Sequence, residues 1–143
     1  MKIIIGCDHG GLNLSTYLKN RLETDGYEVE DLGIYNFEEI DYPDKAIEVA
    51  NYILEGKGDC GILVCGTGIG MSIAANKVKG IRAALCSDTF SARMAKEHND
   101  ANIITLGERT IGNELAYEIV NAYLKAEFVG DKHLVRVEKI MSI

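Results

Sequence analysis

A cysteine stands directly before a glycine-rich loop in the middle of the chain, in the segment C-G-T-G-I-G-M-S of residues 65–72. Glycines at positions 66, 68 and 70 let backbone N–H groups, and the start of a following helix, approach an oxygen or anion of a ligand. A helix N-terminus ahead of Cys65 favours its thiolate form, so Cys65 is a candidate base or nucleophile. The hydroxyl of Thr67, two residues away, could shuttle a proton.

The glycine loop has two other interpretations. A tight strand-to-helix turn needs one or two glycines, fewer than the three present. Dinucleotide binding is suggested by the G-x-G that follows a predicted strand and by Asp88 downstream. Met71 occupies the place of the third glycine, however, and the loop follows the third strand rather than the first, so we favour a cradle for an oxyanion or a sugar oxygen. Cys65 itself could be an inert core cysteine, as we expect of Cys86.

Polar residues at three other places could serve the same chemistry. Asp8 and His9 follow the first apolar run, Arg109 follows the last, and His98 and Asn99 come at the end of a predicted helix. Each also has an ordinary structural interpretation. Asp8 could cap a helix N-terminus and His98 a helix C-terminus, while the others could be solvated surface residues.

The tail of the chain is basic although the chain as a whole is acidic. Fifteen lysines and arginines against 22 acidic residues give a net charge of −7, which argues against nucleic acid or an anionic membrane as partner. From Asp131 onward, Lys132, Arg136 and Lys139 outnumber the acids. An anionic ligand must meet such a local cluster, and Lys132 and Arg136 are candidates, although both could lie on a solvated helix face.

Short apolar runs alternate with helical patterns along the chain. Four runs are continuous, as expected of strands covered on both faces, whereas the second alternates and predicts an edge strand. The predicted strands are residues 2–6, 28–32, 61–65, 82–86 and 102–106. Helices are predicted at about residues 12–26, 41–53, 70–78, 89–96, 113–126 and 134–141. The alternation predicts an α/β fold, a three-layer α/β/α sandwich around a five-stranded parallel Rossmann-like sheet, in one domain over residues 1–143.

The predicted sheet places the candidate loops together. Ligands of parallel sheets bind beyond the carboxyl ends of the strands. The loops at residues 7–11, 65–72, 87–88 and 107–109 follow four of the strands and should share one edge of the sheet. We therefore expect the candidate side chains to converge there.

The four cysteines predict the compartment. They form no C-x-x-C pair and have no metal-ligand spacing with a histidine, which indicates reduced thiols rather than a disulfide framework. The first apolar run is too short for a signal peptide or a membrane span. We expect a cytoplasmic protein.

Several segments resemble type B ribose-5-phosphate isomerase, in collinear order over essentially the whole chain. The wider family also contains allose-6-phosphate isomerase and the two subunits of galactose-6-phosphate isomerase. The matching segments are G-C-D-H-G-G at residues 6–11, D-Y-P at 41–43, C-G-T-G-I-G-M-S-I-A-A-N-K at 65–77, G-I-R-A-A-L-C-S-D at 80–88, E-H-N-D-A-N-I-I-T-L-G-E-R at 97–109 and the basic tail.

The resemblance implies an isomerase of ribose 5-phosphate and ribulose 5-phosphate that works through an enediol(ate), without a metal or an organic cofactor. It implies that Cys65 is the base that moves the proton between C2 and C1. It further implies that Thr67 assists transfer between the two oxygens, and that His98 with Asp8 opens the furanose ring. The residues implied in binding the substrate and its phosphate are His9, Gly66, Gly68, Gly70, Ser72, Asn99, Arg109, Lys132 and Arg136.

The resemblance also implies a homodimer or homotetramer with a shared active site. His98, Asn99 and Arg109 would reach the site from the neighbouring subunit, and the C-terminal helix at about residues 131–143 would pack on the site or on that subunit. Two departures matter. Lys132 stands where many members have arginine, so that contact loses bidentate geometry. Met71 stands in the region where some members carry a glutamate base, which leaves Cys65 that role.

Two other functions stay open. The galactose-6-phosphate isomerase subunits lack the histidine at position 98, so its presence favours a homomeric ribose-type enzyme. Allose 6-phosphate is harder to exclude, because one extra carbon changes the depth of the pocket rather than the catalytic set. A non-catalytic module that binds a sugar phosphate or nucleotide would need only the cradle and the basic tail.

Overall fold

The computed structural model describes residues 1–34 and 36–143. Its centre is a parallel sheet with strand order β2-β1-β3-β5-β4. The strands are β1 (Lys2–Cys7), β2 (Glu28–Asp31), β3 (Cys60–Cys65), β4 (Ala83–Leu85) and β5 (Ile103–Gly107). The helices are α1 (Leu12–Thr24), α2 (Tyr42–Leu54), α3 (Ile69–Ala75), α4 (Thr89–Glu97), α5 (Asn113–Leu124) and α6 (Lys132–Met141).

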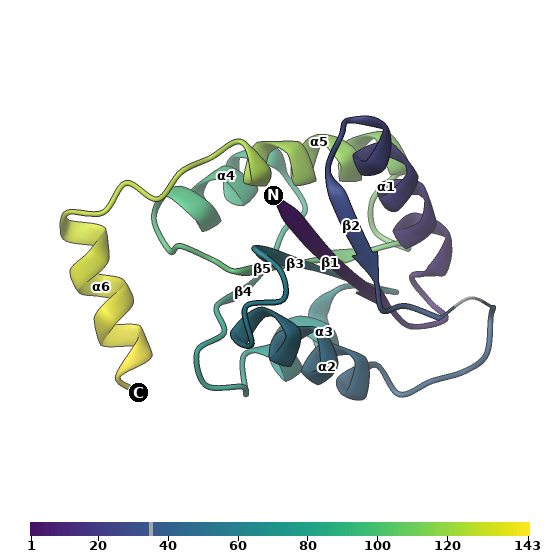
Figure 1. The fold of residues 1–143 in the computed structure, drawn as a ribbon, viewed down its shortest axis with the longest axis horizontal. Helices are drawn as coiled ribbons and strands as arrows, with labels where there is room; N and C mark the ends of the chain where they lie inside the picture. Colours follow the sequence, from purple (N-terminus) through teal and green to yellow (C-terminus); the bar gives the residue numbers. More distant parts are fainter. Residues whose placement is uncertain (35) are drawn as a thin grey trace.

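Two helix layers cover the sheet (Figure 1). Helices α1, α4 and α5 contribute to the core on one face, and α2 and α3 contribute to the core on the other. The predicted three-layer α/β/α fold is thus confirmed, and the termini of most elements lie within two residues of their predicted positions. The first predicted strand is buried on both faces, and its residues Ile3, Ile4 and Ile5 are fully buried. Each such side chain contributes about 1.5–3 kcal/mol through burial.

Helix α1 shows how the sequence pattern produces this packing. Leu14, Leu18 and Leu22 recur every four residues, so they lie on one face of the helix, and all three are fully buried. Helix α2 starts as predicted, with Asp41 at the N-cap and Pro43 in the first turn. Both helices bring the chain back to the amino edge of the sheet, so each following strand runs parallel to the last.

The strand at residues 83–85 differs from its prediction. We expected it to be covered on both faces, but none of its three residues is buried. β4 also forms the edge of the sheet opposite β2 and pairs with β5 alone. Leu85 is 43% exposed. The reason is topological, because β5 enters the sheet between β3 and β4. The length of an apolar run in the sequence does not indicate how many other strands pair with it in the sheet. The predicted edge position of β2 is correct.

Helix α6 stands apart from the three layers. Figure 1 shows it projecting away from the body at the end of the segment that follows α5. Within α6, which the structure describes in full, only Val137 is buried. Leu134, Val135 and Ile140 are exposed. Among the helices of the described residues, none is both long and apolar enough to span a membrane.

Candidate active site

The glycine loop begins at the buried thiol of Cys65, the last residue of β3. Gly68 adopts a left-handed conformation with φ 76° and forms the N-cap of α3. Its N–H donates to the Sγ of Cys65 at 3.1 Å. An N–H directed at a sulfur atom is the arrangement that stabilises a negative charge on it. The helix itself has only seven residues, so the donor that matters is this loop amide.

The hydroxyl side chains of the loop lie near its outer surface. Thr67 is exposed, and its Oγ1 accepts a hydrogen bond from the N–H of Ile69 at 3.3 Å. This bond ties the Thr67 side chain to the first residue of α3 and uses its oxygen as the acceptor, so the hydroxyl proton is not used in it. Ser72 is half-buried in the first turn of α3, and its N–H donates to the carbonyl of Gly68 at 3.1 Å.

The loop after β1 lies against the glycine loop. A Cβ added to Gly10 would lie 3.2 Å from the backbone nitrogen of Gly66, so the two loops touch where neither has a side chain. Asp8 is buried, and its Oδ1 accepts from the N–H of Gly10 at 2.9 Å. The Nδ1 of His9 is buried and has no hydrogen-bond partner among the described residues. Asp8, His9 and Cys65 therefore belong to one edge of the sheet, as predicted.

The loop after β5 clamps the glycine loop from the other side. The N–H of Glu108 donates to the carbonyl of Cys65, and that of Arg109 to the carbonyl of Gly66, each at 2.9 Å. The guanidinium of Arg109 lies over Gly66, where an added Cβ would come within 3.1 Å of its Nη1. We expected Arg109 to reach the site from a neighbouring subunit, but the backbone clamp places it beside the glycine loop of its own chain.

Sequence reasoning missed the part that Glu108 plays. Its Oε2 accepts from the N–H of Leu14 at 2.9 Å and its Oε1 from the Nδ2 of Asn13 at 3.1 Å, so it caps the start of α1. The expected cap was Asp8, whose carboxylate instead holds the turn at Gly10. Glu108 lies 94 residues from Leu14 along the chain. A local sequence pattern cannot show such a cap.

An aromatic ring also borders the loop. The ring of Tyr42 lies over Gly70, where an added Cβ would come within 2.5 Å of its Cε2. Gly70 is therefore required by the close approach of this ring. Tyr42 was not a candidate from the sequence, although it belongs to the D-Y-P segment that resembles the family, and this is the one signal that could have found it.

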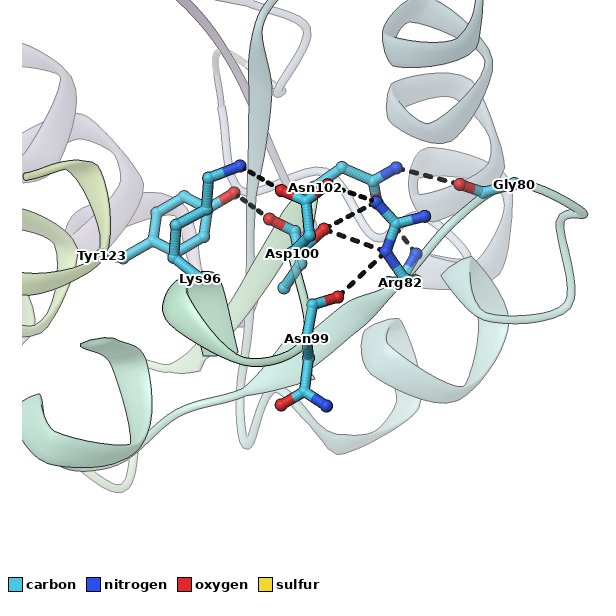
Figure 2. Close-up of polar contacts among 8 residues, drawn as sticks. Gly80, Arg82, Lys96, Asn99, Asp100, Asn102 and Tyr123 are labelled. Carbon is cyan, nitrogen blue, oxygen red and sulfur yellow. Dashed lines mark hydrogen bonds and ion pairs between the residues drawn. The ribbon is translucent and has the colours of Figure 1, made fainter. Parts of the chain in front are cut away.

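His98 and Asn99 lie at the opposite edge of the sheet. Arg82, directly before β4, donates from Nε to the carbonyl of Asn99 at 3.1 Å and to that of Asp100 at 2.9 Å, and pairs with the Asp100 carboxylate at 3.2 Å (Figure 2). These contacts fix the end of α4 at the amino end of β4. The prediction that all candidates share one edge is thus wrong for His98 and Asn99. A helix that follows a strand runs back along it, so the end of α4 falls at the amino edge.

The basic residues Lys132 and Arg136 of the tail lie at the same edge of the sheet as His98. The rings of His98 and His133 stack with centroids 4.0 Å apart and an interplanar angle of 8°. This contact places the first turn of α6, with the exposed Lys132 and Arg136, at the amino edge. Burial lowers the pKa of His133, and the positive charges of His98 and Arg136 lower it further. His133 was not a candidate from the sequence, because nothing local indicates its partner.

The candidate residues thus form two groups within one chain. The first group, around Cys65, lies at the carboxyl edge of the sheet and contains Asp8, His9, Gly66, Thr67, Gly68, Gly70, Ser72 and Arg109. The second group lies at the amino edge and contains His98, Asn99, Lys132 and Arg136. A six-residue strand is about 20 Å long, so a single chain does not bring the two groups together.

The other cysteines differ from Cys65 in their surroundings. Burial raises the pKa of Cys60 to about 12 and that of Cys86 to about 11. Burial also raises the pKa of Cys7, despite its hydrogen bond with Ser15. Raised pKa values favour the protonated thiol at neutral pH, which agrees with the inert role expected of Cys86. Among the described residues, no group of three or more His, Cys, Asp or Glu is arranged to hold a metal ion.

Comparison with known proteins identifies the family. The sequence model of the ribose/galactose isomerase family matches residues 3–140. Ribose-5-phosphate isomerase B of Escherichia coli (strain K12) is 47% identical over 142 residues, which cover 99% of this chain and 95% of that protein.

Solved structures agree with the sequence comparison. A structure of ribose-5-phosphate isomerase B from Clostridium thermocellum is 54% identical, with a TM-score of 0.98 over 99% of this chain and 96% of that one. The enzyme from Mycoplasma genitalium, solved with bound ribulose 5-phosphate, is 40% identical, with a TM-score of 0.94 over 99% of this chain and 94% of that one. The protein described here therefore belongs to the ribose/galactose isomerase family of enzymes.

Proposed function

We propose that the protein interconverts ribose 5-phosphate and ribulose 5-phosphate through an enediol(ate), without a metal ion, and that its active sites are shared between copies of the chain. The observation that carries this proposal is the N–H of Gly68 directed at the buried Sγ of Cys65. The family relationship supports it independently, because relatives that match almost the whole chain are ribose-5-phosphate isomerases. The four free cysteines support a reducing, cytoplasmic location.

Proton transfer is assigned to the group at the carboxyl edge. Moving a proton between C2 and C1 needs one base beside the substrate, and the Cys65 thiolate is that base. The charge that develops on the substrate oxygen needs preorganised donors, and the loop from Gly66 to Ser72 offers backbone N–H groups around it. The exposed hydroxyl of Thr67 is placed to pass a proton between the two oxygens of the enediol.

Ring opening requires an acid and base near neutrality, and it is assigned to His98 acting with Asp8. The two residues lie at opposite edges of one chain. A second copy that presents its amino edge to the carboxyl edge of the first would bring them together. We therefore propose that each active site takes Asp8 and Cys65 from one copy and His98 and Asn99 from another.

The same pairing completes the phosphate site. His9 and Arg109 come from the carboxyl edge of one copy, and Lys132 and Arg136 from the amino edge of another. The buried Nδ1 of His9 has no partner among the described residues, which supports a ligand as its partner. Phosphate held by these residues supplies binding energy remote from the reacting carbons.

Exposed apolar residues support the second copy. Ile69 and Ile73 on α3, Leu85 on β4 and Leu134 on α6 are each at least 43% exposed. A groove of about 820 Å³ separates the C-terminal end of α6 from residues 76–84. Exposed apolar side chains beside a groove are typical of an association site. We propose that another copy of the chain covers it and that α6 packs on that subunit.

The proposal is tested by proton NMR of EDTA-treated protein with ribose 5-phosphate in deuterated water. Formation of the ketose with exchange of solvent deuterium supports a metal-independent enediol mechanism. Allose 6-phosphate and galactose 6-phosphate are run alongside, and faster turnover of either assigns a six-carbon substrate instead. Binding of all three sugars without reaction or exchange would leave a binding module.

A pair of cysteine variants tests the base. Cys65→Ala is expected to abolish turnover while binding of the phosphate ligand largely survives, because the phosphate residues are untouched. Cys86→Ser is the matched control, since Cys86 is also buried but outside the site, and it is expected to keep activity. Equal loss of binding and turnover in Cys65→Ala would contradict the role of Cys65 as base.

A further inference from the structure

Thr105 is a buried hydroxyl residue in an otherwise apolar strand. It is fully buried in the middle of β5, and the residues paired with it are Leu63 on β3 and Leu85 on β4. A hydroxyl taken out of water costs free energy unless it forms a hydrogen bond. The buried hydroxyl of Thr105 therefore requires a hydrogen-bond partner within the protein.

The partner is the residue that faces the sulfur of Cys65. The Oγ1 of Thr105 donates to the carbonyl of Gly68 at 2.8 Å. The N–H of the same glycine donates to the Sγ of Cys65 at 3.1 Å. Both hydrogen bonds are buried. Gly68 thus links Thr105, on one side, to Cys65 on the other.

Gly68 has no side chain of its own to hold its backbone in place. Its φ of 76° lies in the left-handed region that favours glycine. It also lies so close to β5 that an added Cβ would be 2.9 Å from the carbonyl carbon of Leu106. The orientation of its N–H and carbonyl therefore depends on the bonds that they make. The carbonyl has two donors, the hydroxyl of Thr105 and the N–H of Ser72.

We propose that Thr105 is a positioning residue, which holds Gly68 so that its N–H stays directed at the sulfur of Cys65. This inference rests on the proposed role of Cys65 as the base. Among the hydrogen bonds of the described residues, the Thr105 side chain bonds the carbonyl of Gly68 and not the thiol of Cys65. It acts by restricting the rotation of the Gly68 backbone, and a fixed donor stabilises the thiolate better than one that must reorient when the charge forms.

Three variants separate positioning from packing. Thr105→Val keeps the branched shape and removes the hydroxyl, while Ser72 still satisfies the carbonyl of Gly68. Thr105→Ser keeps the hydroxyl and removes a methyl group. Ile103→Val removes a methyl group from the same face of β5, two residues earlier, at a residue that is also fully buried. Thr105→Ala replaces Thr105→Val if the latter does not fold.

Two measurements are made on each variant. The first is the alkylation rate of Cys65 against pH, followed by mass spectrometry of its peptide. In Thr105→Val the midpoint of this profile is expected to move up by about 0.5 to 1 pH unit. The second is steady-state kinetics, in which kcat is expected to fall about three- to tenfold with KM almost unchanged, since the bond acts on the reacting group. Thr105→Ser and Ile103→Val are expected to match the parent protein in both.

The inference is overturned if Thr105→Val leaves both the alkylation profile and kcat unchanged. It is also overturned if Ile103→Val shows the same changes as Thr105→Val, because the effect would then be loss of packing. If the parent protein isomerises none of the sugars, the proposed function fails. The alkylation profiles still decide whether Thr105 controls the thiol of Cys65.

Discussion

The imidazole rings of His98 and His133 lie parallel, with their centroids 4.0 Å apart. His98 ends α4, and His133 lies in the first turn of α6. The stack thus attaches a projecting helix to the amino edge of the sheet, through the residue to which we assign ring opening. Two imidazoles in such contact cannot both carry a proton without repulsion, so the charge of one depends on the other.

The first prediction concerns the titration of His133. Its pKa is lowered mainly by burial, then by the positive charges of His98, Arg136 and Lys132, with Asp131 opposing them. The substitution His98→Gln removes one of the charges that oppose protonation. We expect the pKa of His133 to rise towards its ordinary value without reaching it, because burial remains. Proton NMR titration can measure this, since the chain has three histidines.

The lowered pKa of His133 has a defined effect on stability. The ordinary pKa of histidine is 6.5. Just below this pH, His133 is protonated in a larger fraction of unfolded chains than of folded chains, because its pKa is lower in the folded state. The free energy of unfolding therefore falls as the pH falls through the range between 6.5 and the lower pKa of the folded state. In His133→Gln this component of the pH dependence is expected to vanish. Urea titrations at several pH values measure it, and equal slopes in both proteins would contradict the prediction.

The sequence predicted the sheet and one half of the site because both depend on local patterns. Cys65 ends an apolar run and precedes three glycines, so its place at the carboxyl edge follows from strand direction alone. The edge position of β4 was missed because Leu85 looks like a core residue when its neighbours are unknown. Contacts between distant segments cannot be predicted from a single sequence, because each partner alone is an ordinary residue. Examples are the hydrogen bond from the N–H of Leu14 to Glu108 and the bond from Thr105 to the carbonyl of Gly68.

Another prediction follows from the separation of Cys65 and His98. Cys65→Ala and His98→Gln are each expected to be inactive alone. In a mixed oligomer of the two, one site receives an intact Cys65 from one chain and an intact His98 from the other. Random exchange of the two variants in a 1:1 mixture is expected to restore about a quarter of the parent activity per chain. Activity is measured after the mixture is unfolded and refolded together.

The matched control for this mixture combines two variants of the same edge. Cys65→Ala and Asp8→Asn both alter the carboxyl edge, so no pairing of these chains contains an intact carboxyl-edge half of the site. Their mixture is expected to stay inactive. Recovery in the control, or no recovery in the first mixture, would show that the two edges do not combine across chains.

A further prediction concerns the cap that Glu108 places on α1. Its carboxylate bonds the N–H of Leu14 and the side chain of Asn13. Glu108→Ala is expected to lower the free energy of unfolding by about 0.5–2 kcal/mol, as loss of a helix cap does. Glu118→Ala, at an exposed position on α5, serves as the control and is expected to change it by less than about 0.5 kcal/mol. Denaturant unfolding monitored by circular dichroism gives both values.

The last prediction concerns Lys132, which we propose to bind the phosphate of the substrate. A lysine offers the phosphate a point charge, whereas an arginine offers two parallel donors. If Lys132 binds the phosphate, Lys132→Arg should lower KM for ribose 5-phosphate about two- to fivefold, and inorganic phosphate should inhibit more strongly. The value of kcat should stay almost unchanged, since the phosphate is bound equally before and during reaction. Lys139→Arg, in the last turn of α6, is the matched control. An equal gain in both variants would mean that general positive charge, and not the geometry at residue 132, determines the affinity for phosphate.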